Sequence, residues 1–375
     1  MILTLAMRNL FHDRVRLAVT LVGILFSIVL VAVQLGLYFG ASSIITAVID
    51  RSRADLWITA YGAKSLEESG LLVGNERYQA LSTPGVAAAV PLIATFNRWQ
   101  KKNGGAQLCV VIGTDIADGG LTPWGFVEGN AEAIKAPEAV AVDRTYLKNL
   151  GITGVGDTGQ IDRGRVRVAA LTEGIRSFTT TPYVFTTLTR ARQLLGIPSG
   201  AANYYMVQLK PGADLETVRA ELSRRLPDIE VLTKAEFRNR SLDHWLFGTG
   251  AGVALIGGAL LGTLVGTVIV AQTLYSSTKD HLNEFATLRA LGSSSGYIHK
   301  VILAQAGLSA VIGYVLGMAI ALAVVAASKH SALPMIMTPG LASALFALTV
   351  GMCAISAISA IMKVTRIDPA MVFSR

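Results

Sequence analysis

Four stretches of this sequence are long and apolar enough to cross a lipid bilayer. They comprise residues 17–39, 246–275, 301–327 and 341–362, and none of them contains Asp, Glu, Lys or Arg. About 20 apolar residues in helical conformation span the hydrocarbon core. Only 15% of all residues are charged, whereas soluble domains carry about 25%. The sequence therefore predicts a membrane α-helical protein with four transmembrane helices.

The first stretch follows basic residues, as the apolar part of a secretory signal peptide does. Residues 17–39 exceed the apolar region of about 7–15 residues found in such peptides. No clean small-x-small cleavage site follows the stretch. We therefore expect it to be retained as the first transmembrane helix.

Basic residues near the ends of the stretches predict their orientation, because short cytoplasmic segments are enriched in Lys and Arg. The N-terminal flank, the connector at residues 276–300 and the C-terminal tail together carry nine Lys or Arg and four Asp or Glu. The short connector between the third and fourth stretches has only Lys329. We expect both termini and the connector at 276–300 to be cytoplasmic. Residues 40–247 carry 23 basic and 21 acidic residues, so the basic excess is a topology signal and no nucleic-acid partner is expected.

The segment between the first and second stretches has the pattern of a mixed α/β domain on the periplasmic side. Residues 86–100 and 106–114 are strand-like and flank an Asn-Gly-Gly turn, which is typical of a hairpin. Asp214 can cap a helix that lies between strand-like residues 204–209 and 229–232. The predicted domains are residues 1–40 with the first helix, residues 41–245 as the α/β domain, and residues 246–375 with the other three helices, the connector and the tail.

Residue patterns that carry catalysis are missing from the sequence. There is no G-x-x-x-x-G-K-[ST] motif, so ATP is not bound by a P-loop in this chain. The five histidines are scattered without metal-ligand spacing. Cys109 lies in an apolar, strand-like run, where a small buried side chain is the simpler interpretation. We expect no catalytic residue, no metal site and no cofactor in this chain.

Glycines recur at four-residue spacing in the second and third stretches. They are Gly258, Gly262 and Gly266, followed by Gly313 and Gly317. A helix face without side chains lets another backbone approach closely. This packing can occur within one chain or between two copies, and the spacing does not choose between them.

The connector at residues 276–300 contains a short amphipathic pattern. Leu282, Phe285, Leu288 and Leu291 recur every three residues, and Gly292 stands where a helix end favours left-handed backbone. Such a helix can anchor at the membrane surface. It can also fit into a groove on a partner protein.

The connector's string NEFATLRALGSSSGYI resembles the E-x-x-x-L-R-A-L-G coupling segment of MacB-like permeases, a family that includes lipoprotein-release and FtsX relatives. The opening LAMRNLFHDRVRLAVTLVGILFSIVLV, the turn ITGVGDTGQI and the tail TRIDPAMVFSR are similar to the same MacB/FtsX-like family of ABC transporter permeases. The string QLGLYFG is closest to the DevC branch, which is linked to glycolipid export. Asn283 departs from the pattern, because relatives often have a basic residue there, and this puts one ion pair to the ATPase in doubt.

The resemblance implies an ATP-driven machine in a bacterial inner membrane. Two permease copies would pair, and two separate ABC ATPase subunits, which bind ATP and magnesium, would contact the connectors. A periplasmic adaptor and membrane lipids are further implied partners. The coupling contacts it implies are Glu284, Phe285, Leu288, Arg289, Leu291 and Gly292.

Three functions are compatible with the resemblance. The first is export of lipid-like or amphipathic cargo taken from the outer leaflet or the periplasm. The second is an FtsX-like mechanotransmitter that activates a periplasmic hydrolase without transport. The third is an ABC-linked sensor.

Overall fold

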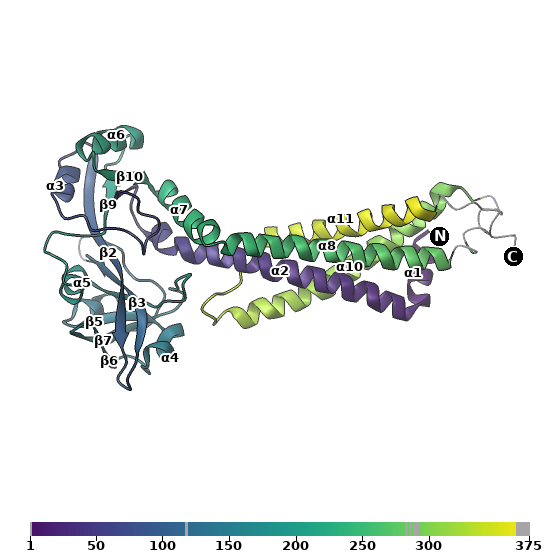
Figure 1. Cartoon of the computed structure of the whole chain (residues 1–375), viewed down its shortest axis with the longest axis horizontal. Helices are drawn as coiled ribbons and strands as arrows, with labels where there is room; N and C mark the ends of the chain where they lie inside the picture. Colours follow the sequence, from purple (N-terminus) through teal and green to yellow (C-terminus); the bar gives the residue numbers. More distant parts are fainter. Residues whose placement is uncertain (1, 117–118, 282–283, 285–286, 288–292, 365–375) are drawn as a thin grey trace. The chain divides into compact units, whose positions relative to one another are not determined.

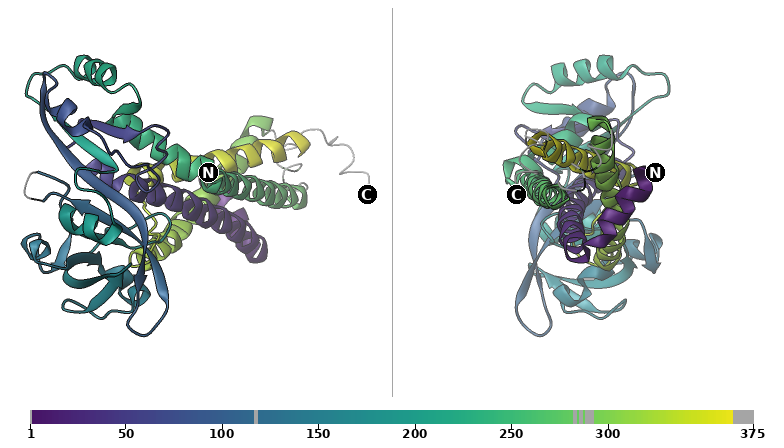
Figure 2. Two further views of the ribbon diagram at one scale, coloured as in Figure 1. Left: turned by 60° about the vertical axis from the view of Figure 1, so that its left-hand side comes forward. Right: turned by 90° about the vertical axis from the view of Figure 1, so that its right-hand side faces the viewer.

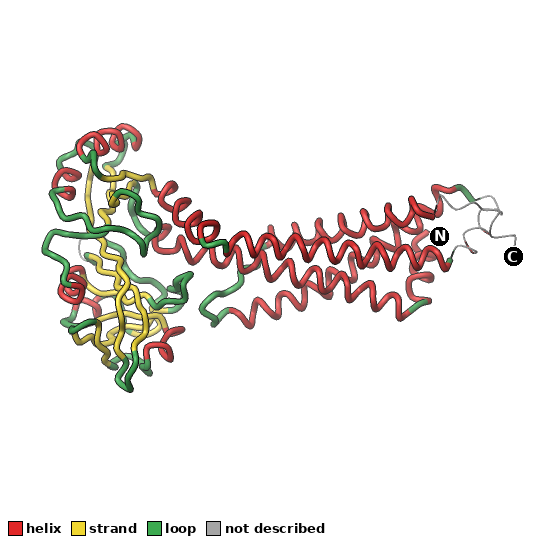
Figure 3. The backbone as a smooth tube through the Cα atoms, viewed as in Figure 1, coloured by secondary structure: helices red, strands yellow, loops and turns green. Residues whose placement is uncertain are grey.

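The computed structural model describes residues 2–116, 119–281, 284, 287 and 293–364. The chain divides into two compact units. The first contains residues 1–40, 253–329 and 334–375, and the second contains residues 41–252 and 330–333. Figures 1 and 3 show that long helices build the first unit and that strands and short helices build the second.

The helical unit consists of long apolar helices packed side by side (Figure 2). Its elements are α1 (Ile2–His12), the part of α2 (Arg14–Arg51) that ends at Gly40, α8 (Ala251–Asp280), α10 (Ser295–Ser328) and α11 (Pro339–Val364). In the part of the chain that the structure describes, α2, α8, α10 and α11 are long and apolar enough to span a membrane. The predicted four transmembrane helices are confirmed.

Packing in this unit follows the helical repeat. On α10, Ile298, Ile302, Ala306 and Ala310 are buried at four-residue spacing, which places them on one face. They share a core with Ile24 and other residues of α2, α8 and α11. The opposite faces carry exposed Leu, Val and Ile side chains, as expected for surfaces that contact lipid tails.

The predicted start of the second transmembrane helix at Leu246 is wrong. A π-helix, η3 (Asp243–Gly248), precedes α8, and Gly250 has a positive φ of 80° that ends the helical run before Ala251. Leu246 is buried within the α/β unit. The prediction included Leu246 in the membrane segment because it rested on hydropathy, and a leucine in a protein core has the same hydropathy as a leucine that faces lipid.

The second unit is built on one mixed sheet of ten described strands in the order β10-β1-β9-β2-β3-β8-β5-β7-β4, with β6 paired to β2 and β7. The pairs β3·β8 and β5·β7 are parallel, and the other pairs are antiparallel. The strands are β1 (Leu56–Ala60), β2 (Val86–Gln100), β3 (Ala106–Thr114), β4 (Phe126–Glu128), β5 (Ala139–Asp143), β6 (Thr158–Ile161), β7 (Gly164–Thr172), β8 (Tyr183–Thr187), β9 (Tyr204–Leu209) and β10 (Ile229–Thr233).

Short helices accompany the sheet, and the mixed α/β prediction is confirmed. They are α3 (Glu76–Leu81), α4 (Leu147–Leu150), α5 (Leu188–Leu195), α6 (Leu215–Arg225) and α7 (Lys234–Leu242), with 3₁₀ turns at η1 (Glu132–Lys135) and η2 (Arg144–Tyr146). Asp214 caps α6 by accepting the Thr217 N–H at 2.8 Å. Sequence reasoning missed α7, although Thr233 and Glu236 form the T-x-x-E capping box that marks a helix start.

The long strand β2 joins two halves of the sheet. Its residues from Val86 to Leu92 pair with β9, and those from Leu92 to Gln100 pair with β3 in the predicted hairpin. The first half packs against α6 through a core that contains Val218 and Leu222. The second half has its own core around Trp99.

Candidate functional site

The predicted coupling segment follows α8. Of its six implied contact residues, Glu284 is the one that the structure describes. Glu284 is helical and exposed, and its Oε2 lies 3.0 Å from Nδ1 of His281. Phe285, Leu288, Arg289, Leu291 and Gly292 lie outside the described residues.

The end of α8 is fastened to the start of α2 by an ion pair. The Arg16 guanidinium donates to the Asp280 carboxylate and also lies 3.4 Å from Oδ2 of Asp13. Asp13 caps α2 by accepting the Arg16 N–H at 3.1 Å. The charged trio therefore joins the helix that enters the connector to the first transmembrane helix.

A small polar pocket lies beside this ion pair. It has a volume of about 20 Å³ and is lined by residues of α1, α2, α8 and α10, including Asn9, Thr273 and Gln305. A space of this size holds about one water molecule. Several polar side chains of the bundle thus lie next to Arg16.

The three glycines of α8 face α2. A Cβ added at Gly258 would lie 2.6 Å from Nε2 of Gln34, and one at Gly262 would lie 3.0 Å from Cδ2 of Leu30. At Gly266 the added Cβ would lie 2.4 Å from Cβ of Ser27. The Ser27 hydroxyl also donates to the Gly262 carbonyl at 2.9 Å.

The two glycines of α10 face the same helix. A Cβ at Gly313 would lie 2.4 Å from Cγ2 of Ile24, and one at Gly317 would lie 3.0 Å from Cγ2 of Ile28. Helix α2 therefore sits in close contact with both α8 and α10 within one chain. Real Cβ atoms essentially never approach as closely as at Gly258, Gly266 and Gly313, and few approach as closely as at Gly262 and Gly317. Side chains at these positions would therefore crowd α2.

A buried carboxylate, Glu67, ties η3 to the rest of the α/β unit, and no sequence motif marked it. Its Oε2 accepts from the Ser65 hydroxyl at 3.1 Å and from the Trp245 indole N–H at 3.3 Å. Its Oε1 accepts from the Tyr183 hydroxyl. Hydrogen bonds to a charged acceptor are roughly twice as strong as neutral ones. Burial, together with the neighbouring Glu67 charge, raises the pKa of Tyr183, so the phenol remains a donor.

The end of α2 is also anchored in the α/β unit. Val48 and Ile49 are buried in the core that contains Trp57 and Phe237. The Lys234 ammonium, at the start of α7, donates to the carbonyls of Asp50 and Ser52 at 2.9 and 2.8 Å.

Arg238, one turn further along α7, extends this anchor. Its Nε lies 3.2 Å from Oδ1 of Asp50. The residues that precede α8 and those that end α2 are thus both held by the same unit.

Reactive chemistry is not assembled in the described part of the chain. No group of three or more His, Cys, Asp or Glu residues there could hold a metal ion. Burial raises the pKa of Cys109 to about 12. The Cys109 thiol therefore stays protonated and is a poor nucleophile at neutral pH.

Two family descriptions match the chain. The MacB-like periplasmic core domain matches residues 17–225, which is more than half of the sequence. The FtsX-like permease C-terminal domain matches residues 256–369.

The chain is also similar to curated relatives and to solved structures. Uncharacterised ABC transporter permeases of Mycobacterium tuberculosis and Mycobacterium bovis are each 25% identical over 386 residues, covering 98% of both chains. The periplasmic region of MacB from Actinobacillus actinomycetemcomitans has a TM-score of 0.38 and 10% identity, covering 50% of this chain and 93% of that one. The extracellular domain of the ABC-type transporter YknZ from Gram-positive bacteria has a TM-score of 0.35 and 10% identity, covering 48% and 99%.

Proposed function

Because this chain belongs to the MacB/FtsX-like family of ABC transporter permeases, we propose that it drives export of lipid-like or amphipathic cargo from the outer leaflet or the periplasm. The chain is the permease subunit, and nucleotide binding belongs to a partner ATPase. The glycolipid exporters of the DevC branch are the proposed functional model, supported by the QLGLYFG string at the end of the first span.

In the proposed assembly, two copies of this chain pair in the bacterial inner membrane. Both termini and the connector at 276–300 are cytoplasmic, and two ATPase subunits bind the connectors. The apolar side chains of Phe285, Leu288 and Leu291 fill a groove on the ATPase, with Glu284 and Arg289 pairing at its rim and Gly292 ending the helix. A periplasmic adaptor passes the cargo onward.

The observation that carries the proposal is that α2 and α8 are fastened together in the helical unit, while the end of α2 and the residues that precede α8 are held within the α/β unit. At the connector end, Arg16 bonds to Asp280. In the α/β unit, Ile49 of α2 is buried in the core, and Trp245, which precedes α8, bonds to Glu67.

Force applied to the connector can therefore reach the periplasmic unit through two helices. Between the fastened ends, the glycine contacts keep α2 and α8 in close contact. Closely packed interiors have low compressibility and transmit strain. Closure of the ATPases would then move the periplasmic unit. The cargo would be bound and moved at this unit and would not pass through a central pore.

The test of coupling is ATPase stimulation in the purified permease–ATPase complex. Leu288→Asp places a charge in the proposed apolar contact and should abolish stimulation. Glu284→Lys should reduce it several-fold by reversing the rim charge. Glu132→Lys changes an exposed acid on η1 in the other unit and should leave stimulation intact. Wild-type stimulation in both connector variants would exclude the coupling assignment.

Export is tested separately, by deleting the gene in its host and following membrane lipids. Accumulation of one lipid class in the inner membrane supports the proposal. Unchanged lipids together with a defect in cell-wall cleavage would instead support the FtsX-like role. The neighbouring genes offer a first check, since an ATPase beside an adaptor favours export, an ATPase beside a peptidoglycan hydrolase favours mechanotransmission, and a histidine kinase favours the sensor role.

A further inference from the structure

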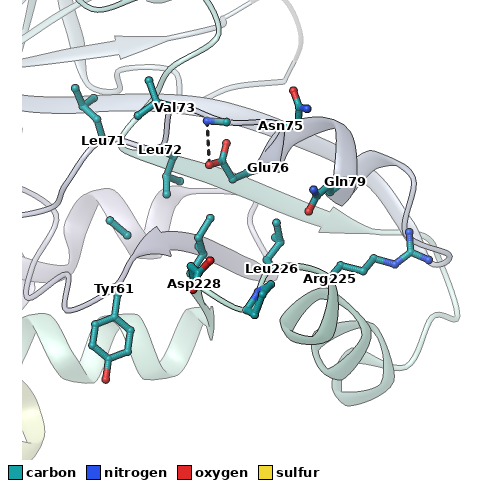
Figure 4. Close-up of a pocket in the computed structure, with 14 residues that line it drawn as sticks. Tyr61, Leu71, Leu72, Val73, Asn75, Glu76, Gln79, Arg225, Leu226 and Asp228 are labelled. Atoms are coloured by element: carbon teal, nitrogen blue, oxygen red, sulfur yellow. Dashed lines mark hydrogen bonds between the residues drawn. The ribbon is translucent and has the colours of Figure 1, made fainter.

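A pocket of about 400 Å³ opens on the surface of the α/β unit. Its walls come from the end of β1, the segment that leads into α3, and the turn that joins α6 to β10 (Figure 4). None of the residues that tie the unit to α2 and η3 lines it. The pocket is therefore separate from the contacts that hold the end of α2 and the residues before α8.

The buried acid of this pocket is Glu76, at the first position of α3. The side chain is only 9% exposed. Its Oε1 accepts the Gly74 N–H at 3.0 Å, as Figure 4 shows. Its Oε2 has no hydrogen-bond partner among the described residues. A buried carboxylate oxygen without a donor is unfavourable, so a donor brought by a ligand would be strongly preferred.

The charge of the pocket is negative. Asp228, in the turn before β10, is exposed on the same pocket as Glu76, and neither carboxylate has an ion-pair partner in the described part of the chain. The Arg225 guanidinium is already engaged, because it donates to Glu221 at 2.6 Å and to the Ser82 hydroxyl at 3.3 Å. Two uncompensated acids therefore favour a cationic group.

The remaining wall is apolar and partly open to solvent. Leu72 and Leu226 are buried in it, while Tyr61 is 84% exposed and Val73 is 65% exposed. The aliphatic stem of an Arg or Lys packs well on such a wall while its head reaches a carboxylate. Exposed apolar residues around a charged centre are typical of the contact sites that proteins use to recognise one another.

We propose that this pocket is a docking site for a segment of a second periplasmic protein that presents an Arg or Lys between apolar residues. Oε2 of Glu76 is itself buried, so the carboxylate turns towards the pocket as the cationic head bonds to it, and Asp228 adds attraction. The flanking apolar side chains cover Tyr61 and Val73. The inference requires only that the unit is periplasmic, and it depends neither on the cargo nor on the coupling contacts.

Peptide binding to the full chain in phosphatidylcholine nanodiscs tests the proposal by calorimetry, with empty nanodiscs as the blank. The probe is acetyl-Leu-Arg-Leu-amide at up to millimolar concentration. Its matched control replaces Arg with citrulline, which keeps the shape and removes the charge. Glu76→Gln should weaken binding of the Arg peptide about tenfold, as expected for loss of one hydrogen bond between charged groups. Asp228→Asn should weaken it about two- to threefold, as for an exposed charge, and Glu132→Gln should leave it unchanged.

Four results with the peptides would overturn the proposal. They are absence of binding, equal binding of the citrulline peptide, equal binding to Glu76→Gln, and equal binding of acetyl-Gly-Arg-Gly-amide, which would mean that the apolar wall makes no contact. Tighter binding of hexylammonium than of the peptide would assign the pocket to a small amphipathic cation and also exclude protein docking. If Glu76→Gln fails to fold, Asp228→Asn and the citrulline peptide decide. No ATPase is present, so the outcome is independent of the proposed export function.

Discussion

The indole N–H of Trp245 donates to Oε2 of Glu67 at 3.3 Å, joining two residues that are 178 positions apart in the sequence. Trp245 lies in the π-helix that precedes α8, and Glu67 is buried beside Tyr183. Insertions of π-helix are frequent at functional sites. This bond holds the residues that precede α8 within the α/β unit.

Trp245→Phe removes this donor while keeping an aromatic ring next to Phe178. We expect a loss of about 1–3 kcal/mol in the free energy of unfolding, because a buried carboxylate loses a partner. ATPase stimulation should fall as well, since the force reaching the unit through α8 is weakened.

Trp99→Phe is the matched control for this prediction. The Trp99 indole donates to the Leu150 carbonyl at 3.0 Å, is more deeply buried than Trp245, and lies far from η3 in the sequence. Trp99→Phe should lower the stability at least as much as Trp245→Phe without reducing stimulation. Equal stimulation in both variants would show that the Trp245 bond is structural only.

Gly313→Ala should destabilise the helical unit. The added methyl would lie 2.4 Å from Cγ2 of Ile24, and overpacking of this kind costs about 1–3 kcal/mol. Gly307→Ala is the control on the same helix, because a Cβ there meets nothing within 4 Å. Thermal unfolding in detergent should show a lower transition temperature for Gly313→Ala and an unchanged or higher one for Gly307→Ala. Equal transition temperatures would contradict the close contact between α10 and α2.

Arg16 and Asp280 should show a small coupling energy in a double-mutant cycle of Arg16→Gln and Asp280→Asn. Their side chains are 24% and 56% exposed, so we expect a coupling of about 0.2–1 kcal/mol that decreases with salt. Each single variant should reduce ATPase stimulation to the same extent. This loss should be more pronounced than the change in stability. Additive loss of stimulation in the double variant would mean that the two residues act separately.

Glu221 should make the stability of α6 depend on acid pH. Hydrogen bonds from Arg224 and Arg225 lower its pKa from the ordinary value of 4.5 to about 2. Because the pKa is lowered in the folded state, its stabilising contribution is present above pH 4.5 and is lost as the pH falls towards 2. Hydrogen-exchange protection of α6, corrected for intrinsic rates, should therefore decline over this range in the wild type. Protection in Glu221→Gln should be lower at neutral pH and should converge with the wild type near pH 2.

Local patterns were sufficient to predict the elements whose cause is local. An uncharged run of apolar residues forms a spanning helix in α2 and α10 whatever surrounds it, and the Asn-Gly-Gly turn brings β2 onto β3. Asp214 caps α6 through a bond only three residues away. In each case the interacting groups are neighbours along the chain, so their spacing in the sequence is also their spacing in space.

Tertiary structure decided the features that depend on distant partners. Glycine spacing along α8 and α10 predicted that another helix packs closely against each of them. Only the tertiary structure shows that α2 contacts the glycine faces of both helices. Leu246 could not be separated from the membrane segment by hydropathy, and its burial in the α/β unit assigns it to η3. Glu67 and Glu76 look like ordinary surface acids in the sequence. Folding brings Trp245 and Tyr183 to Glu67 and leaves Oε2 of Glu76 without a donor, because burial and hydrogen bonding depend on which segments meet and not on the residues beside them.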